Sequence, residues 1–326
     1  MLILGVGSIG ERHLRCFQAT GRVELSLCDI REELRRRVAR QYGIGRTYAD
    51  FEAALADGHA AAVIATPAHL HVPMAVRLAE AGTHLLIEKP LGTGLDGIDR
   101  LQEAIRRRRL VAAVAYVLRG HPALRAMKQA IDSGRFGEPV QLVAAAGQHF
   151  PTYRPAYREI YYADRATGGG AIQDGLTHVL NAAQWLVGPI DSLVADAAHQ
   201  VLDGVEVEDT VGLLARHGGV LASYSLNQHQ APNECTITVI CRRGTARCEF
   251  HHHRWRWMVE PDGPWHEEDF GPIERDSLFV AQANAFLDCI EGLARPVCTL
   301  DEGIDTLRAN LAALASLTAH NWQTVV

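Results

Sequence analysis

The chain has 326 residues, of which 48% are hydrophobic and 21% are charged, and its formal net charge is −6. This composition is that of a soluble globular protein of about two domains. The acidic balance argues against a nucleic-acid partner, no apolar run approaches the ~20 residues of a membrane span, and no secretion signal is visible. We therefore expect a cytoplasmic protein with no membrane or nucleic-acid partner.

The first part of the chain alternates short apolar runs with helical patterns, a βαβ rhythm. Strands are expected at 1–7, 23–29, 60–67, 83–90 and 110–118, and helices at 8–20, 31–43, 47–57, 69–82 and 94–109. Such alternation predicts a doubly wound parallel sheet with helices on both faces, a Rossmann domain. We place this domain at residues 1–119.

The rhythm changes after about residue 120. Helices are expected at 121–137, 171–188, 277–293 and 299–321, and strands at 138–150, 192–201, 209–228, 234–250 and 254–260. The alternating strands, joined at Gly and Asn turns, predict hairpins of a large, mostly antiparallel sheet. Residues 120–326 are therefore expected to form an α+β domain, and the whole chain is α/β.

A glycine-rich turn follows the first strand. Gly5-Val6-Gly7-Ser8-Ile9-Gly10 leaves a strand and opens a helix, as the dinucleotide-binding G-x-G-x-x-G pattern requires. Gly5 permits the turn, Gly7 lets a pyrophosphate approach, and Gly10 lets helix and strand pack closely. Amide groups at the helix start, including those of Ser8 and Ile9, favour phosphate. A tight turn without a ligand is the alternative.

An acidic residue ends the second strand, as dinucleotide binding also requires. Asp29 lies where a carboxylate binds the adenosine ribose, which favours NAD over NADP. Arg31 lies two residues later and has the charge to pair with a 2′-phosphate, so NADP stays possible. We assign Asp29, Ile30 and Arg31 to the cofactor site.

Two further strand ends carry polar residues. Thr66 and Pro67 follow a buried strand at its carboxyl end, where open α/β sheets bind ligands, with His71 shortly after. A strand stop and helix start explain Pro67 equally well. Glu88-Lys89-Pro90 ends the next strand. A charged lysine without partners is costly at the mouth of a buried strand, and a lysine whose pKa is lowered there suits proton transfer. Spacing alone does not distinguish this function from a solvated ion pair.

A second candidate pair lies in the α+β domain. Asp174 and His178 follow the glycine run 168–170 and are four residues apart, so they share one helical face. Asp174 is placed to orient His178, which titrates near neutral pH. An ordinary surface pair is the alternative.

These motifs, in this order, resemble the Gfo/Idh/MocA family, which includes glucose–fructose oxidoreductase and inositol dehydrogenase. The resemblance rests on the glycine turn, Thr66-Pro67 with His71, Glu88-Lys89-Pro90, and Asp174 with His178. It implies hydride transfer between NAD(P) and a secondary alcohol or ketone of a sugar or polyol. It also implies an open sheet that joins a homodimer or homotetramer.

The resemblance further implies roles for individual residues. Lys89 and His178 form the acid/base pair, Asp174 assists them, and Glu88 supports Lys89 or the nicotinamide ribose. A cis bond precedes Pro90. Tyr116 and Arg119 border the substrate, although Gly120 departs from the usual residues at that point.

The aromatic and basic stretch 150–165 is consistent with a sugar pocket. Tyr153 and Tyr157 are suited to pack on sugar C–H faces, and Arg158 to meet a carboxylate or phosphate. A surface loop whose tyrosines pack on the sheet is an equally good interpretation.

Metal and disulfide chemistry are not expected. The seven cysteines form no C-x-x-C pair. No nearby acid or cysteine completes a metal site with His251-His252-His253, so an edge or interface strand is favoured.

Two rival functions stay open on the same fold. One is an NAD-dependent glycosidase that oxidises its substrate transiently. The other is a non-enzymatic sugar or dinucleotide sensor, which has no need for Lys89, Asp174 and His178 together.

Overall fold

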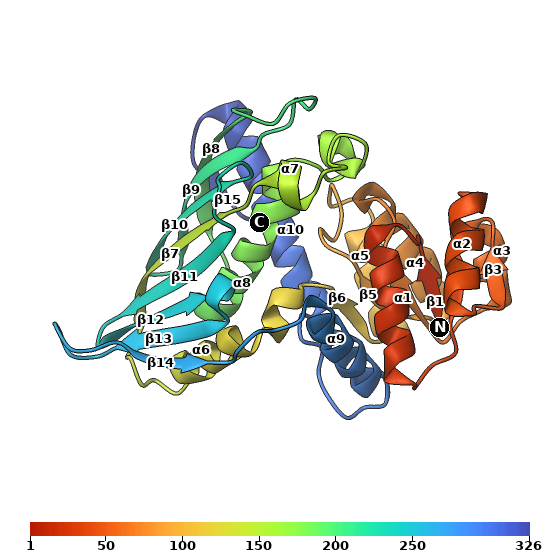
Figure 1. Cartoon of the computed structure of the whole chain (residues 1–326), viewed down its shortest axis with the longest axis horizontal. Coiled ribbons are helices and arrows are strands. Elements are labelled where there is room, and N and C mark those ends of the chain that lie inside the picture. The colour runs from red at the N-terminus through yellow and green to blue at the C-terminus, as the bar shows by residue number, and fades with distance from the viewer. The chain divides into compact units, whose positions relative to one another are not determined.

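The computed structural model describes residues 1–326 and divides into two compact units (Figure 1). The first unit comprises Met1–Val117 and Glu274–Ile304, and the second comprises Leu118–Ile273 and Asp305–Val326. None of its helices is long and apolar enough to cross a membrane.

The first unit is a six-stranded parallel sheet in the order β3-β2-β1-β4-β5-β6, the order of a Rossmann fold. Its core consists of apolar strand residues such as Ile3 and Val63, with Phe17 of the first helix. Its elements are β1 (Leu2–Leu4), α1 (Ser8–Thr20), β2 (Ser26–Cys28), α2 (Glu32–Tyr42), β3 (Arg46–Tyr48), α3 (Phe51–Asp57), β4 (Ala61–Ile64), α4 (His71–Ala81), β5 (His84–Ile87), α5 (Ile98–Arg108), β6 (Ala112–Val114) and α9 (Arg275–Ile290).

The second unit is a nine-stranded sheet in the order β14-β13-β12-β11-β7-β10-β9-β8-β15. Its pairs are antiparallel except β7 with β10. Its elements are α6 (Pro122–Asp132), β7 (Pro139–Gly147), α7 (Phe150–Tyr153), α8 (Thr177–Val187), β8 (Ser192–Ala198), β9 (Thr210–His217), β10 (Val220–Asn227), β11 (Glu234–Cys241), β12 (Gly244–Glu249), β13 (Arg254–Met258), β14 (His266–Asp269), most of α10 (Leu300–Ala319), and β15 (Gln323–Thr324).

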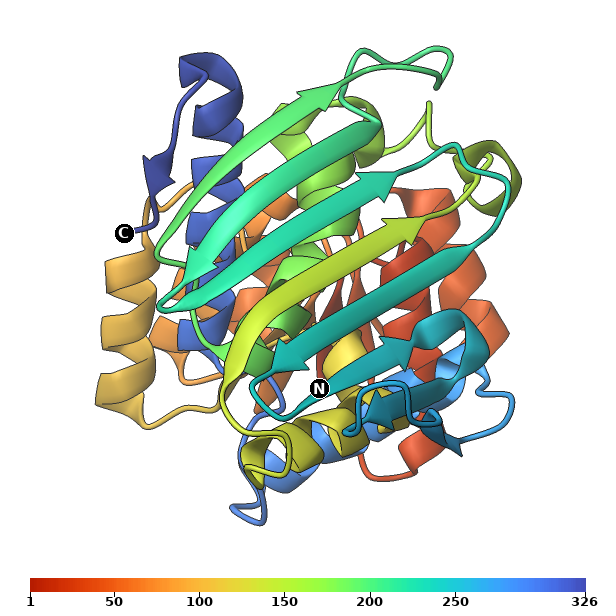
Figure 2. The same ribbon diagram turned by 90° about the vertical axis from the view of Figure 1, so that its left-hand side faces the viewer.

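One face of this sheet is covered and the other is open. Figure 2 looks onto the open face, with α8 and α10 behind the strands. Leu180 of α8 and Ala313 of α10 pack on strand residues such as Leu213 in one core. The alternation of apolar and polar residues along β9 and β10 thus reflects a sheet with one packed face. The predicted fold class is confirmed.

The path of the last helices differs from the expected division at residue 119. The segment 274–304, which we assigned to the second domain, belongs to the first unit. Phe286 of α9 packs edge-to-face on Phe17 of α1, and Asp276 pairs with Arg12 and Arg15. The apolar stripe of an amphipathic helix predicts that one face is buried, but it does not indicate which sheet covers that face.

Two local expectations were also wrong. The strand β3 was read as the start of a helix, because its three residues are largely exposed and carry little apolar signal. His251 and His252 lie in a 3-10 turn rather than on a strand, and His253 follows with a positive φ of 51°.

Candidate active site

The candidate residues of the first unit gather along the carboxyl edge of its parallel sheet. Leu4, Cys28 and Ile64 are in register in neighbouring strands, and Ile64 is in register with Ile87. The residues that follow these strand ends therefore lie in one row. They are Gly5, Asp29, Ala65 and Glu88. Three of them begin a predicted cofactor motif, and Ala65 directly precedes the motif that begins at Thr66.

The glycine turn is built for close approach. A Cβ at Gly10 would lie 1.8 Å from the carbonyl oxygen of Gly5, so this position has no room for a side chain. Gly5 has a φ of +80°, which favours glycine. A Cβ at Gly7 would meet only Arg31 Nη2, at 3.6 Å. The turn is thus packed on its inner side and open at Gly7, which fits a pyrophosphate.

The amino end of α1 adds to this open site. Ser8 is exposed and Ile9 is half-buried, packing against the core. No side chain caps the helix at Gly7. The first amide groups of α1 are therefore oriented as a phosphate requires.

Asp29 is buried and is held by several donors. Its carboxylate accepts hydrogen bonds from the backbone N–H of Val6 and from the backbone and guanidinium of Arg31, at 2.9 to 3.0 Å. Burial acts to raise the pKa of Asp29, but these donors outweigh it and hold the pKa below its usual value. Ile30 beside it is 82% exposed, an uncovered apolar surface at the cofactor edge.

His71, a predicted cofactor residue, is enclosed by the protein. Its ring is buried, with Nε2 2.7 Å from the carbonyl oxygen of Thr66 and Nδ1 2.9 Å from that of Pro90. Burial lowers the pKa of His71, against the effect of these two carbonyls. The ring thus bridges two loops of the protein, while Thr66 and Pro67 lie nearer the surface.

Lys89 lies between two buried neighbours at the end of β5. Glu88 and Pro90 are buried, whereas Lys89 is half-buried, and the Lys89–Pro90 peptide is cis. Glu88 Oε2 accepts the backbone N–H of Lys89 at 3.0 Å, and Glu88 Oε1 lies 2.6 Å from His13 Nε2. The carboxylate therefore contacts protein on both oxygens.

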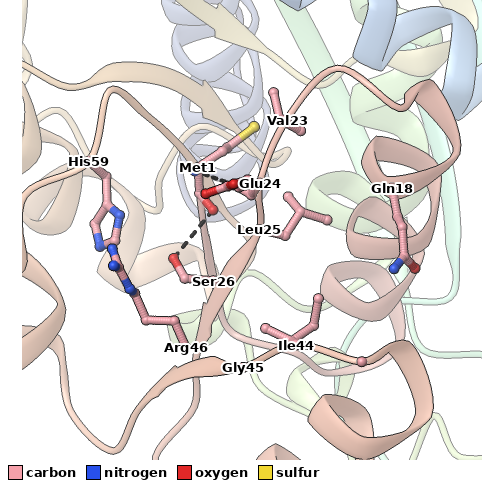
Figure 3. Close-up of a pocket in the computed structure, with 11 residues that line it drawn as sticks. Met1, Gln18, Val23, Glu24, Leu25, Ser26, Ile44, Gly45, Arg46 and His59 are labelled. Carbon is pink, nitrogen blue, oxygen red and sulfur yellow. Dashed lines mark hydrogen bonds between the residues drawn. The ribbon is translucent and has the colours of Figure 1, made fainter.

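A cavity of about 410 Å³ lies at the other edge of this sheet (Figure 3). Met1, Ser26 and Arg46, which line it, precede or begin β1, β2 and β3. Open α/β sheets bind ligands at the carboxyl ends of their strands. This cavity therefore lies at the edge opposite the predicted cofactor residues.

In the second unit, Asp174 lies on a π-helical turn, Ile172–Leu176, which runs into α8. An unbroken α-helix was expected here. Such turns widen a helix locally and occur often at functional sites. From residue 171 to 184, every position is buried except Gly175 and His178. His178 is thus the one half-buried side chain in this otherwise buried stretch, and its Nδ1 atom is itself buried.

Two contacts brace this turn. The hydroxyl of Tyr161 donates to Asp174 Oδ1 at 2.6 Å. Glu208, buried on the neighbouring strand connection, accepts the backbone N–H of Ile172 at 3.2 Å and pairs with Arg165 at 2.7 Å. The π-helical turn is therefore held at its amino end, through Ile172, and at the carboxylate of Asp174.

The other predicted substrate residues have varied surroundings. Tyr157 is buried, and both its hydroxyl and Arg158 Nε donate to the carbonyl oxygen of Asp203, which supports the surface-loop interpretation for these two. Tyr153 is 49% exposed. Arg119 is buried and donates to Asn181 Oδ1 at 2.7 Å, and Tyr116 is buried.

Sequence reasoning missed His13 and Glu208 as parts of the site, and it did not indicate the contact of Tyr161 with Asp174. His13 gave one signal, a polar residue on the apolar stripe of α1 beside Leu14 and Phe17. The contacts of Tyr161 and Glu208 join residues 13 and 36 positions apart. No local pattern marks such contacts.

The chain matches two models of one family. The model described as oxidoreductase family, NAD-binding Rossmann fold, matches residues 1–116, and the GFO/IDH/MocA C-terminal domain matches residues 124–247. The chain is 26% identical, over 73% of its length and 70% of the relative's, to levoglucosan dehydrogenase of Pseudarthrobacter phenanthrenivorans. It is 33% identical, over 57% of its length and 53% of the relative's, to inositol 2-dehydrogenase of Pseudomonas savastanoi pv. phaseolicola.

Solved structures show the same fold. Levoglucosan dehydrogenase in complex with NADH has a TM-score of 0.90 at 20% identity, over 100% of this chain and 98% of that one. The glycine turn and the buried carboxylate at the end of β2 agree with this likeness. The chain belongs to the Gfo/Idh/MocA oxidoreductase family, and its first domain is that family's NAD-binding Rossmann fold.

Proposed function

We propose that this protein is an NAD-dependent dehydrogenase that interconverts a secondary alcohol and a ketone of a sugar or polyol. The observation that carries the proposal is Lys89, half-buried between two buried residues at the carboxyl edge of the Rossmann sheet. The names of the two relatives, levoglucosan dehydrogenase and inositol 2-dehydrogenase, support the substrate class.

The cofactor is held by residues of the first unit. The amides that open α1 bind the pyrophosphate in front of Gly7, the exposed Ile30 side chain packs on the adenine, and Asp29 accepts the ribose hydroxyls. Arg31 balances the charge of Asp29, so a 2′-phosphate meets less repulsion than a lone carboxylate would produce. NAD is therefore preferred, and NADP is tolerated. When bound, NAD supplies the acceptor for the hydride that leaves the carbinol carbon.

Lys89 and His178 move the proton. In this proposal one of the two, the amine of Lys89 or the imidazole of His178, takes the hydroxyl proton as the carbonyl forms, and the other stabilises the developing charge. Asp174, held by Tyr161, favours one orientation of His178. Tyr116, Arg119, Tyr153, Tyr157 and Arg158 stay candidates for the surroundings of the substrate.

The chain contains a matched control for the lysine. It has two lysines, Lys89 and Lys128, and Lys128 forms an i,i+4 ion pair with Asp132 on a helix surface. Reduced-cofactor absorbance is followed with a panel of sugars and polyols, using NAD and NADP. Lys89→Ala should lower kcat at least about a hundredfold while NAD still binds, and Lys128→Ala should change it less than about twofold. Wild-type turnover by Lys89→Ala would rule out the assignment.

The open face of the nine-stranded sheet supports our proposal of a homodimer or homotetramer. Val143, Leu214 and Leu221 on this face are 40 to 52% exposed, which is unusual for a row of large apolar side chains. Light scattering after size-exclusion chromatography should give a dimer or tetramer, and Leu214→Glu should release monomers. A monomeric wild type would contradict this proposal.

A further inference from the structure

Two buried histidines contact the segment that carries Lys89. We propose that His13 and His71 are positioning residues that hold the backbone on either side of Lys89. The inference rests on the proposed role of Lys89, and it assigns to His71 a structural contact in place of cofactor binding. Both histidines belong to the same unit as Lys89.

His13 holds Glu88 from α1. Its side chain is 1% exposed and that of Glu88 is 6% exposed, and His13 Nε2 lies 2.6 Å from Glu88 Oε1. Because an ionised carboxylate only accepts hydrogen bonds, Nε2 carries the proton and donates. The ring packs edge-on against Phe279 of α9, with centroids 5.5 Å apart, which fixes its direction.

Glu88 in turn contacts the backbone of Lys89. Its second oxygen accepts the backbone N–H of Lys89 at 3.0 Å, so one carboxylate joins α1 to the backbone of the reactive residue. Burial acts to raise the pKa of Glu88, but the hydrogen bond from His13 and the charges of His13 and Lys89 hold the pKa below its ordinary value. Glu88 therefore stays an acceptor at neutral pH.

His71 holds the other side of the segment. Its ring, 1% exposed, lies 2.9 Å from the carbonyl oxygen of Pro90 and 2.7 Å from that of Thr66. A neutral imidazole donates from one nitrogen at a time, so the ring hydrogen-bonds one of these carbonyls and packs against the other. In either tautomer it lies between the chain after Lys89 and the loop after β4. The backbone of Lys89 is held before and after the residue, while its own side chain is partly exposed.

Stability alone does not account for these contacts. Replacing a buried charged pair by apolar residues of similar volume is often neutral or stabilising. The side chains of His13, His71 and Glu88 are also too buried to meet a ligand. What the contacts do supply is a fixed position for Lys89, and a displacement of about 1 Å at a reacting group can lower a rate by about a hundredfold.

The test compares His13→Phe and His71→Phe with His13→Gln, and uses His59→Gln as the matched control. Phenylalanine keeps a ring and removes the donor, whereas glutamine at position 13 keeps a donor for Glu88. His59 lies in the same unit and lines the cavity at the amino ends of the strands. The first readout is hydrogen exchange of the Lys89 amide in the cofactor-free protein. The second is kcat and KM, together with the Kd for NAD.

Both Phe variants should lower kcat about ten- to a hundredfold with the Kd for NAD changed less than about threefold. His13→Phe should speed exchange of the Lys89 amide at least about tenfold. His13→Gln should recover most of both losses, and His59→Gln should match wild type. Wild-type kcat and exchange in a folded His13→Phe protein would overturn the proposal for His13, and wild-type kcat in a folded His71→Phe protein would overturn it for His71. Equal losses of kcat and of amide protection in His13→Phe and His13→Gln would show that His13 acts through packing alone, which would overturn its role as a donor to Glu88.

Glu88→Met keeps the test decisive if His13→Phe does not fold. Methionine has a similar length but no carboxylate oxygen, so both His13 and the Lys89 amide lose their acceptor. Exchange at Lys89 should therefore accelerate, and unchanged exchange and kcat would overturn the proposal. If wild type oxidises no sugar or polyol, the proposed function fails, whereas the exchange readout still tests the positioning of Lys89.

Discussion

Replacing Gly7 or Gly10 by alanine separates cofactor binding from folding. Gly7 has φ −65° and ψ −169°, which alanine adopts without strain, and its added Cβ would meet only the flexible end of Arg31. Gly7→Ala should therefore raise the free energy of unfolding of the cofactor-free protein by ~0.4–1 kcal/mol, through the unfolded state. In Gly10→Ala the Cβ would lie 1.8 Å from a backbone oxygen, so a loss of at least ~1–3 kcal/mol is expected.

Binding of NAD should make wild type more stable than Gly7→Ala, the reverse of their order without cofactor. NAD at a hundred times its Kd stabilises wild type by ~2.7 kcal/mol, which corresponds to a rise in Tm of roughly 5–10 °C for a domain of this size. Gly7→Ala should show no such rise, because its methyl group occupies the surface that the pyrophosphate approaches. Differential scanning calorimetry and isothermal titration with NAD measure both effects.

Three results would contradict this reasoning about Gly7 and Gly10. Wild-type affinity for NAD in Gly7→Ala would show that the pyrophosphate does not lie against this turn. A destabilised Gly7→Ala protein without cofactor would show that Gly7 is needed for packing instead. Wild-type stability of Gly10→Ala would contradict the close approach between α1 and β1.

Three further outcomes follow from single contacts. Tyr161→Phe removes the hydrogen bond to Asp174 and should lower kcat roughly tenfold or more, with the Kd for NAD unchanged, in steady-state assays and titration. Arg31→Ala leaves Asp29 as an uncompensated anion, so the Kd for NADP should rise at least about tenfold more than the Kd for NAD; equal changes would contradict the charge argument. Asp209 accepts three backbone N–H groups at 2.7 to 3.0 Å, and these donors outweigh burial and lower its pKa. Its stabilisation is therefore present above the pKa of the unfolded state and is lost as pH falls through the folded pKa, so urea unfolding of Asp209→Asn should lack that acid-side loss.

The sequence was most informative where the required pattern is local. The βαβ rhythm predicts the Rossmann sheet, and the positions of Gly5, Asp29, Thr66 and Lys89 after successive strands place them at one edge of it. The cap of α3 is equally local, because Asp50 accepts the backbone N–H of Ala53 three residues later. Parallel strands and helix caps follow from spacing alone, because each is set within a few residues.

The contacts that the sequence did not predict join residues far apart in the chain. The contact of His13 with Glu88 joins residues 75 positions apart, and the ion pair of Arg12 with Asp276 joins residues 264 apart. The π-helical turn at Asp174 was read as an α-helix, since both conformations have the same residue preferences. Arg158, a candidate for binding a substrate anion, donates to the carbonyl of Asp203, a contact that no spacing could indicate.

The most direct test of the account follows a label from substrate to cofactor. The enzyme is incubated with NAD and a sugar or polyol that it oxidises, carrying deuterium on the carbinol carbon, and the reduced cofactor is analysed by mass spectrometry. Net reduced cofactor with one deuterium per ketone formed is predicted for wild type and Lys128→Ala, with almost none for Lys89→Ala. Substrate consumption without net reduced cofactor, or reduced cofactor without deuterium, would contradict direct transfer from the alcohol carbon.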